Sequence, residues 1–168
     1  MITKNELIDK VRAKEELSGL RLSNVDLSGS NLFAAFFNSA KFEDVVFIDA
    51  NLRESKLSEA QLDGCDLGRV DLRDSDLTKS SFKNAHMRGA DFRRANLEGA
   101  DFSGADLRRA NFMGANLKGA IFDNSNLHRA DFQGSNVRGV DFRNSEVIGA
   151  YFLETDLSDT KFPEGFES

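Results

Sequence analysis

The sequence predicts an all-β solenoid, a rod of stacked coils, because three regular patterns run through nearly all of it. Every fifth residue from Leu22 to Phe162 is Leu, Phe, Met or Val. The residue two places before each of these is small or of medium size, as at Ala95 and Thr160. In the C-terminal half, the large position also alternates between Phe and a smaller aliphatic residue.

The five-residue period fits no single helix or strand. An α-helix needs apolar residues at a spacing of about 3.6, and a half-buried strand needs a spacing of 2. A chain that coils can instead place one large and one small residue of each repeat inside. Such short units bury their apolar side chains only against neighbouring units, which is the defining property of a solenoid.

The alternation of Phe with smaller residues indicates the length of one coil. Phe can stack on Phe between coils only if each coil holds an even number of repeats, and two repeats cannot enclose a core. Four pentapeptides therefore form the smallest coil that fits. Parallel strands lie about 4.8 Å apart, so seven coils make a rod roughly 34 Å long. The phenylalanines concerned are Phe92, Phe102, Phe112, Phe122, Phe132, Phe142, Phe152 and Phe162.

Glycine placement predicts where each coil turns its corners. Most of the 13 Gly lie two places after a large position, and Asn24, Asn84, Asn124 and Asn144 share that place. Gly and Asn tolerate the positive φ that the third residue of a type II turn requires. This register is therefore expected to form the corners.

The repeats resemble a known motif. Residues 90–94, 95–99 and 105–109 read ADFRR, ANLEG and ADLRR, similar to the A(D/N)LXX repeat of pentapeptide-repeat proteins. The resemblance extends over residues 20–164. It implies a right-handed quadrilateral β-helix with four pentapeptides per coil and about seven coils, in agreement with the coil length above. A family resemblance of this kind predicts a fold more than a task.

Three parts are expected: an N-terminal capping helix and lead-in over 1–19, the solenoid over 20–164 and a tail over 165–168. Thr3 and Glu6 form a capping-box pattern, and Ile2 is placed to pack on Leu7 as a hydrophobic staple. A helix from about residue 4 to 16 would lay Leu7, Ile8 and Val11 over the open first coil. It would also block an exposed strand edge, which invites self-association.

Outward apolar residues lie near both ends of the solenoid. Ile148, Tyr151 and Leu153 precede a short tail that contains Phe166, and this end predicts a homodimer; alternatively, Phe166 and the tail fold back over them. At the other end, outward apolar residues are expected to pack against the helix or to form a local bulge, rather than to bind a partner. Those outward residues are Phe33, Phe36, Val46 and Ile48.

Composition narrows the class of protein. The chain has 168 residues, a net charge of −6 and a pI near 5.0, which predict one acidic, soluble domain. No apolar run approaches a membrane span, and residues 1–20 are too charged for a signal peptide. We expect a cytoplasmic, bacterial protein, as is usual for the family.

Catalytic chemistry is not expected. His86 and His128 lie about two coils apart with no second His or Cys nearby, so we predict no metal site and no cofactor. Cys65 falls in the small inward register, where packing is favoured over reactivity. The Asp or Asn before most large residues recurs too often for acid–base pairs and predicts bonds to local backbone. The chain is therefore predicted not to be an enzyme.

Arginines gather in columns when coils of four pentapeptides are stacked. One face would carry Arg69, Arg88, Arg108, Arg109, His128 and Arg129, and the next face would carry Arg53, Arg73, Arg93 and Arg94. Stacked arginines repel unless they are neutralised. Two interpretations remain: neutralisation by the adjacent Asp66, Asp71, Asp91 and Asp106, or a strip that binds an acidic partner protein.

These observations favour a non-enzymatic scaffold that presents flat side-chain ladders to a partner protein. The candidate partner-binding residues are Arg69, Arg73, Arg88, Arg93, Arg108, Arg109 and Arg129. Nucleic acid is not the expected partner, since the chain is acidic and no outward aromatics interleave with the arginines. The alternative is a DNA-mimicking modulator of gyrase or topoisomerase IV, the role of the family members that confer fluoroquinolone resistance. Basic residues outnumber acidic ones over 88–143, which departs from an evenly negative DNA mimic.

Overall fold

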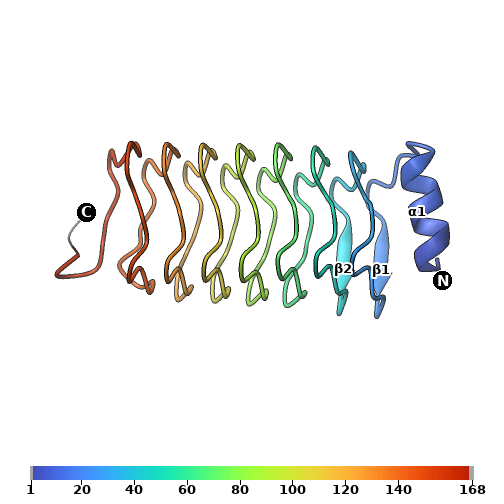
Figure 1. The fold of residues 1–168 in the computed structure, drawn as a ribbon, viewed down its shortest axis with the longest axis horizontal. Helices are drawn as coiled ribbons and strands as arrows, with labels where there is room; N and C mark the ends of the chain where they lie inside the picture. The colour runs from blue at the N-terminus through green and yellow to red at the C-terminus, as the bar shows by residue number, and fades with distance from the viewer. Residues whose placement is uncertain (1, 167–168) are drawn as a thin grey trace.

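The protein is a straight rod of stacked coils, closed at one end by a helix (Figure 1). The computed structural model describes residues 2–166. Helix α1 (Lys4–Arg12) lies across the first coil, and the chain then winds coil upon coil to the opposite end. The predicted β-helix is confirmed, because parallel bridges join each coil to the next along the rod.

The coil length of four pentapeptides is also confirmed. Strands β1 (Arg21–Ser23) and β2 (Lys41–Glu43) pair in parallel, with Leu22 opposite Phe42. Isolated parallel bridges continue the same offset along the rod, from Glu16 with Phe36 to Asp141 with Lys161. Most faces hold a bridge rather than a longer strand, since the chain turns a corner in every repeat.

Each corner except that at Asn144 is a tight turn whose third residue has positive φ. In the repeat that begins at Phe92, the amide of Ala95 donates to the Phe92 carbonyl at 3.0 Å, and Arg94 has a φ of 58°. This is the geometry of a type II turn. The predicted corner register is therefore correct, but it holds many residues other than Gly, whose φ values lie between 52° and 60°.

Asn144 departs from the corner geometry predicted for it. Asn24, Asn84 and Asn124 have positive φ, whereas Asn144 does not. The carbonyl of Asn144 itself accepts the Asn124 amide at 3.1 Å, while at regular corners the carbonyl of the preceding residue does so. The turn therefore takes a different form here: the Asn144 carbonyl, rather than that of Arg143, points toward the preceding coil.

Two stacks of phenylalanine rings fill the C-terminal half of the core. Rings that are one full coil apart lie nearly parallel, with centroids 4.9 Å apart for both Phe92–Phe112 and Phe112–Phe132. Rings that are half a coil apart meet edge to face, such as Phe112 and Phe122 at 6.1 Å. Both are favourable aromatic geometries. An even number of repeats in each coil predicted this stacking of Phe on Phe.

The small inward register contains serines with two different environments. Ser55 and Ser80 donate their hydroxyl groups to the carbonyls of Leu52 and Leu77, at 2.6 and 2.7 Å. Within the described residues, three buried serine hydroxyls have no hydrogen-bond partner, namely those of Ser30, Ser125 and Ser135. A buried polar group without a partner costs about 1–3 kcal/mol of stability.

Replacing Ser135 by Ala is therefore expected to stabilise the protein by about 1 kcal/mol, since Ala occupies this register in many repeats. The free energy of unfolding in urea measures the effect. Ser55→Ala is the matched control, because it removes a hydroxyl that does form a bond. Equal losses of stability in both variants would contradict the expectation.

The N-terminal helix caps the first coil as predicted but ends earlier. The Thr3 hydroxyl accepts the Glu6 amide, and the Glu6 carboxylate accepts the Thr3 amide at 2.7 Å, so the capping box is present. Leu7 and Val11 are buried against the core. The helix ends at Arg12 rather than near residue 16 because the chain reverses at Lys14, whose φ is 56°.

The outward apolar residues near the helix lie in two environments. Phe33 borders a hollow with Val11 and Lys14 at the end of α1, so it lies beside the helix as the sequence favoured. Ile48 instead lies over Gly68 on the next coil, where a Cβ atom would come within 3.8 Å of it. Because Gly68 has no side chain, Ile48 can pack onto this corner, where it is half-buried.

Candidate partner-binding surface

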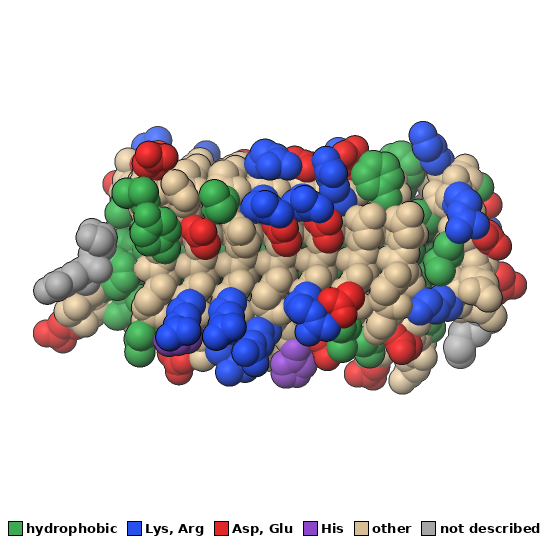
Figure 2. Space-filling model, viewed as in Figure 1, with side chains coloured by type: hydrophobic (Ala, Val, Ile, Leu, Met, Phe, Trp, Pro, Cys, Tyr) green, Lys and Arg blue, Asp and Glu red, His purple; other side chains and the backbone are tan. Residues whose placement is uncertain are grey.

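The arginines predicted to form columns occupy two neighbouring corners of the rod, on either side of one flat face. The bridge ladder of this face includes Asn51, Asp71, Asp91 and Asn111. Figure 2 shows the basic side chains as two rows along the rod, separated by a flat band. We call the set Arg69, Arg88, Arg108, Arg109, His128 and Arg129 the arginine corner, and the set Arg53, Arg73, Arg93 and Arg94 the second row.

Several arginines are neutralised within their own repeat. Arg73 donates through Nε and Nη2 to both carboxylate oxygens of Asp71, at 2.8 and 2.6 Å, and its backbone amide also donates to Asp71. Arg108 pairs with Asp106 in the same way. Hydrogen bonding from these arginines lowers the pKa of Asp71 and Asp106. An Asp before the large residue thus neutralises an Arg after it, and Arg93 with Asp91 also fits this rule.

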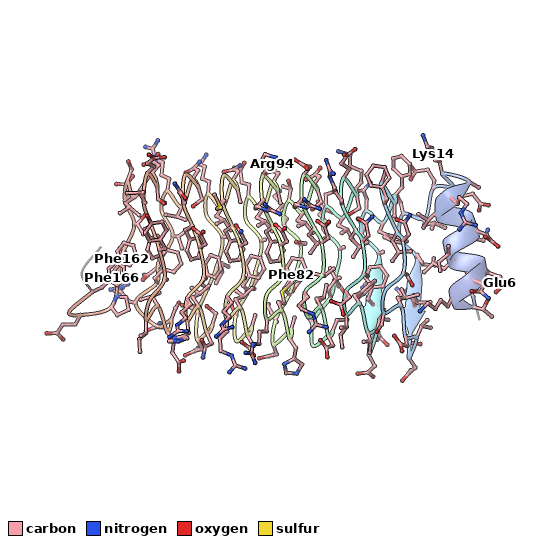
Figure 3. The ribbon with its side chains drawn as sticks, viewed as in Figure 1. Glu6, Lys14, Phe82, Arg94, Phe162 and Phe166 are labelled. Atoms are coloured by element: carbon pink, nitrogen blue, oxygen red, sulfur yellow. The ribbon has the colours of Figure 1, made fainter. Side chains whose placement is uncertain are left out.

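Other arginines are neutralised by the preceding coil. Arg69 forms a two-pronged pair with Asp49, at 2.7 and 2.6 Å, and Arg94 forms one with Asp74, at 2.7 and 3.0 Å. The expected neutraliser Asp66 takes no part in an ion pair within residues 2–166; its carboxylate accepts the Gly68 amide instead. Arg94 lies at the upper edge of the rod in Figure 3.

Three arginines of the corner remain without a carboxylate partner in the part of the chain that the structure describes: Arg88, Arg109 and Arg129. All three are exposed. Their repeats explain this. Position 86 is His where a neutralising Asp would stand, and the coil before Arg109 presents Gly89 at the equivalent corner. The coil before Arg129 presents Arg109 itself, so two like charges follow one another.

A hollow of about 460 Å³ lies beside two of these free arginines, Arg88 and Arg109. Its lining includes Gly68 and Gly89, which have no side chains, and Arg69, Arg88 and Arg109. Ile48 and Asp66 complete the lining. Arg88 and Arg109 are both exposed to solvent where they line the hollow.

The C-terminal end combines a covered core with uncovered apolar side chains. The ring of Phe166 stacks on Phe162 with centroids 4.2 Å apart, so the tail takes the place of a further coil (Figure 3). It does not cover the three outward residues: Ile148 is 72% exposed, and Tyr151 and Leu153 are each 49% exposed. A homodimer through this end stays a prediction.

The repeats themselves decide the family. Eight copies of the model for pentapeptide repeats match the chain, in overlapping segments from 16–47 through 125–163. The chain belongs to the pentapeptide-repeat family. Residues 16–163 lie within these matches, so the family covers nearly all of the chain.

Solved pentapeptide-repeat structures share its fold. HetL of the cyanobacterium Nostoc, a protein involved in heterocyst differentiation regulation, aligns over 100% of both chains with a TM-score of 0.59 and 20% identity. A trypsin-treated form of QnrB1, a plasmid-mediated fluoroquinolone resistance protein, aligns over 90% of this chain and 84% of its own. Its TM-score is 0.50 and its identity 23%. The search of curated proteins gave no match. Identities this low establish the fold alone.

The described part of this pentapeptide-repeat protein contains no cluster of three or more His, Cys, Asp or Glu side chains placed to hold a metal ion. His86 and His128 are exposed on different coils; His128 belongs to the arginine corner, and His86 lies on the adjoining face. Among residues 2–166, no helix has the length and apolar character needed to span a bilayer.

Cys65 is expected to be unreactive in the native protein. Its side chain is buried, and Sγ lies 3.5 Å from the Phe42 carbonyl. Burial raises the pKa of the thiol to about 11, so the thiolate that reacts with disulfide reagents is scarce at neutral pH. Labelling with a chromogenic disulfide at pH 7.5 should be slow in buffer and rapid in denaturant. Rapid labelling of the folded protein would contradict this burial.

Proposed function

We propose that the protein is a non-enzymatic binding scaffold whose arginine corner binds an acidic surface of a partner protein. The observation that carries the proposal is the set of three exposed arginines, Arg88, Arg109 and Arg129, that the described part of the protein leaves unneutralised. Their neighbours Arg69 and Arg108 are already paired with carboxylates. Three free positive charges therefore follow one another along one corner of a protein whose net charge is −6.

The rod suits this task because it holds the charges in fixed relation. Each corner is locked by a turn hydrogen bond and by the bridges to the coils on both sides. A single exposed ion pair contributes only about 0.2–1 kcal/mol, so useful affinity requires several pairs formed at once. A rigid row of three free guanidinium groups meets that requirement, since solenoid surfaces are extended and repeat regularly.

Substitution by glycine at two of the corner positions tests the proposal without disturbing the fold. Arg109 and Arg129 have φ values of 59°, a conformation that Gly adopts without strain. The variant would combine Arg109→Gly and Arg129→Gly with Arg88→Gln. Arg94→Gly is the matched control, because Arg94 has the same register and a φ of 58° but is paired with Asp74.

The measurement is affinity capture from a bacterial lysate, with bound proteins identified by mass spectrometry and confirmed by direct binding of each purified candidate. Wild type and Arg94→Gly are expected to retain an acidic protein that the triple variant loses. The retained complex should also weaken as salt rises from about 50 to about 500 mM, because exposed charges are screened. Identical captures from all three proteins would overturn the proposal.

The alternative function, action on a topoisomerase by imitation of DNA, rests on the shared fold with QnrB1. The surface argues against it. The arginine corner interrupts the negative charge that a duplex carries along its whole length (Figure 2). Away from the arginine columns, Glu98 and Asp101 are paired with Lys118 and Lys83. A gyrase supercoiling assay is expected to show neither inhibition nor protection from a quinolone at micromolar protein, and either effect would favour the alternative.

A further inference from the structure

The free arginines and one exposed isoleucine form a single strip along the arginine corner. Arg88, Arg109 and Arg129 belong to three successive coils, and Ile148 occupies the same corner of the following coil. Ile148 is the most exposed of the large hydrophobic side chains in the described residues, at 72%. The strip therefore presents three positive groups and then an apolar group, one for each coil.

The spacing of this strip selects the secondary structure that can match it. Parallel strands are about 4.8 Å apart, so the four groups lie at roughly 0, 5, 10 and 14 Å along the rod. In an α-helix, residues i, i+3, i+7 and i+10 lie on one face at roughly 0, 4.5, 10.5 and 15 Å. In a strand, side chains on one face repeat at roughly 6.7 Å, and the fourth lies near 20 Å. A helix parallel to the rod stays in register with the strip, and a strand does not.

The immediate surroundings leave the strip open to such a helix. A Cβ atom at Gly149 would lie 3.4 Å from Cγ of Arg129, so the stem of Arg129 extends over a glycine toward the coil of Ile148. Glu146, two residues before Ile148 in the sequence, accepts a hydrogen bond from Asn126 at 2.6 Å and forms no ion pair with the corner within residues 2–166. A groove lined by Ile148, Ala150 and Phe166, and also by Glu146 and Glu164, adjoins this end of the strip.

We propose that this strip binds an acidic amphipathic α-helix of a partner protein, which lies parallel to the rod. Carboxylates on three successive turns of the helix pair with Arg88, Arg109 and Arg129, and an apolar side chain on the adjoining turn packs on Ile148. The carboxylate that faces Arg88 also reaches the hollow above Gly68 and Gly89. This inference rests on the proposed function and specifies the partner's chemistry: charge complementarity along the corner, with one hydrophobic anchor at its C-terminal end.

Synthetic peptides of about 15 residues, long enough for four turns of an α-helix, test the inference directly. Two hydrocarbon-stapled helices carry Glu at the helix spacing and one Leu on the adjoining turn, at the C-terminal end in one peptide and at the N-terminal end in the other. A third stapled helix has the same composition with the Glu residues spread around all faces. A fourth peptide is extended and carries Glu at alternate positions. Fluorescence anisotropy with the full-length protein measures each affinity.

One of the two matched helices is expected to bind roughly tenfold more tightly than the spread helix or the extended peptide, since only it forms all the contacts at once. Arg109→Gly and Arg129→Gly should each weaken its binding about two- to fivefold, the range for single exposed ion pairs. Ile148→Ser should weaken it by a similar factor, and Arg94→Gly should leave it unchanged.

The outcomes separate this inference from the proposed function. If the spread or extended peptide binds as tightly as the matched helices and the arginine variants weaken all of them, the acidic-partner function stands and the helix inference is wrong. If none of the peptides binds below about 1 mM, both are overturned. Circular dichroism of each variant confirms that a lost affinity does not come from a lost fold.

Discussion

Deleting a single pentapeptide, residues 101–105, is expected to destabilise the protein more than deleting the complete coil of residues 91–110. Both deletions keep the five-residue pattern and every backbone turn. They differ in which side chains become stacked at the new junction, because contacts between coils join positions exactly one coil apart in the sequence.

The shorter deletion shifts every later column by one face. Phe112 would then lie over Met87, and Leu107 would lie over Phe82, so large and smaller residues are mismatched at all four positions of that junction. Overpacked or underpacked sites in a core each cost about 1–3 kcal/mol, which sums to several kcal/mol here. After the longer deletion, Phe112 lies over Leu72 as Phe92 does in the parent, and each of the other stacks is likewise restored.

Thermal unfolding followed by circular dichroism compares the three proteins. The protein lacking one full coil is expected to melt near the parent temperature, since neighbouring coils form the same contacts as before. The protein lacking one pentapeptide should melt well below both. A lower melting temperature for the full-coil deletion would mean that the match between coils matters less than the length of the rod.

Replacing Phe112 by Ala is expected to cost about 3–5 kcal/mol of unfolding free energy. The ring is fully buried in the middle of a stack, parallel to Phe92 and Phe132, with centroids 4.9 Å away on both sides. It also meets Phe102 and Phe122 edge to face. Removal leaves a cavity that the rigid backbone of the coils cannot close.

Phe162→Ala provides the control for position in the stack. Phe162 is only half-buried and lies at the end of the rod, between Phe142 and Phe166. Phe162→Ala should lower the unfolding free energy clearly less than Phe112→Ala, because the tail can move into the space that the ring leaves. Unfolding in urea gives both values, and an equal cost at the two sites, or less than about 1 kcal/mol for Phe112, would contradict this account of the core.

The sequence predicted the core and the corners residue by residue. A single repeating requirement, one large and one small inward side chain in every repeat, acts at each position from Leu22 onward. The alternation of Phe with Leu or Val along the repeats then indicated the coil length from the sequence alone. The irregular corner at Asn144 was not foreseen, because its residue type is the same as that of the regular corners.

The candidate surface was predicted only in part. Stacking by whole coils placed the arginines in their two rows, but it did not show which of them are neutralised. Arg69 pairs backward with Asp49, whereas Arg73 pairs within its own repeat with Asp71. The spacing of Asp two residues before Arg is a signal in the sequence that could have identified the pairs within one repeat.

The amino-acid sequence by itself determined the β-helix, its coil of four pentapeptides, its inward columns and the columns in which the arginines stack. These follow from the identity of one residue at a time, repeated along the chain. Only the tertiary structure decided that Arg88, Arg109 and Arg129 are free within the described residues and that Phe166 closes the end while Ile148 stays exposed. Such outcomes depend on the direction in which long side chains lean across coils, and a linear pattern carries no information about that direction.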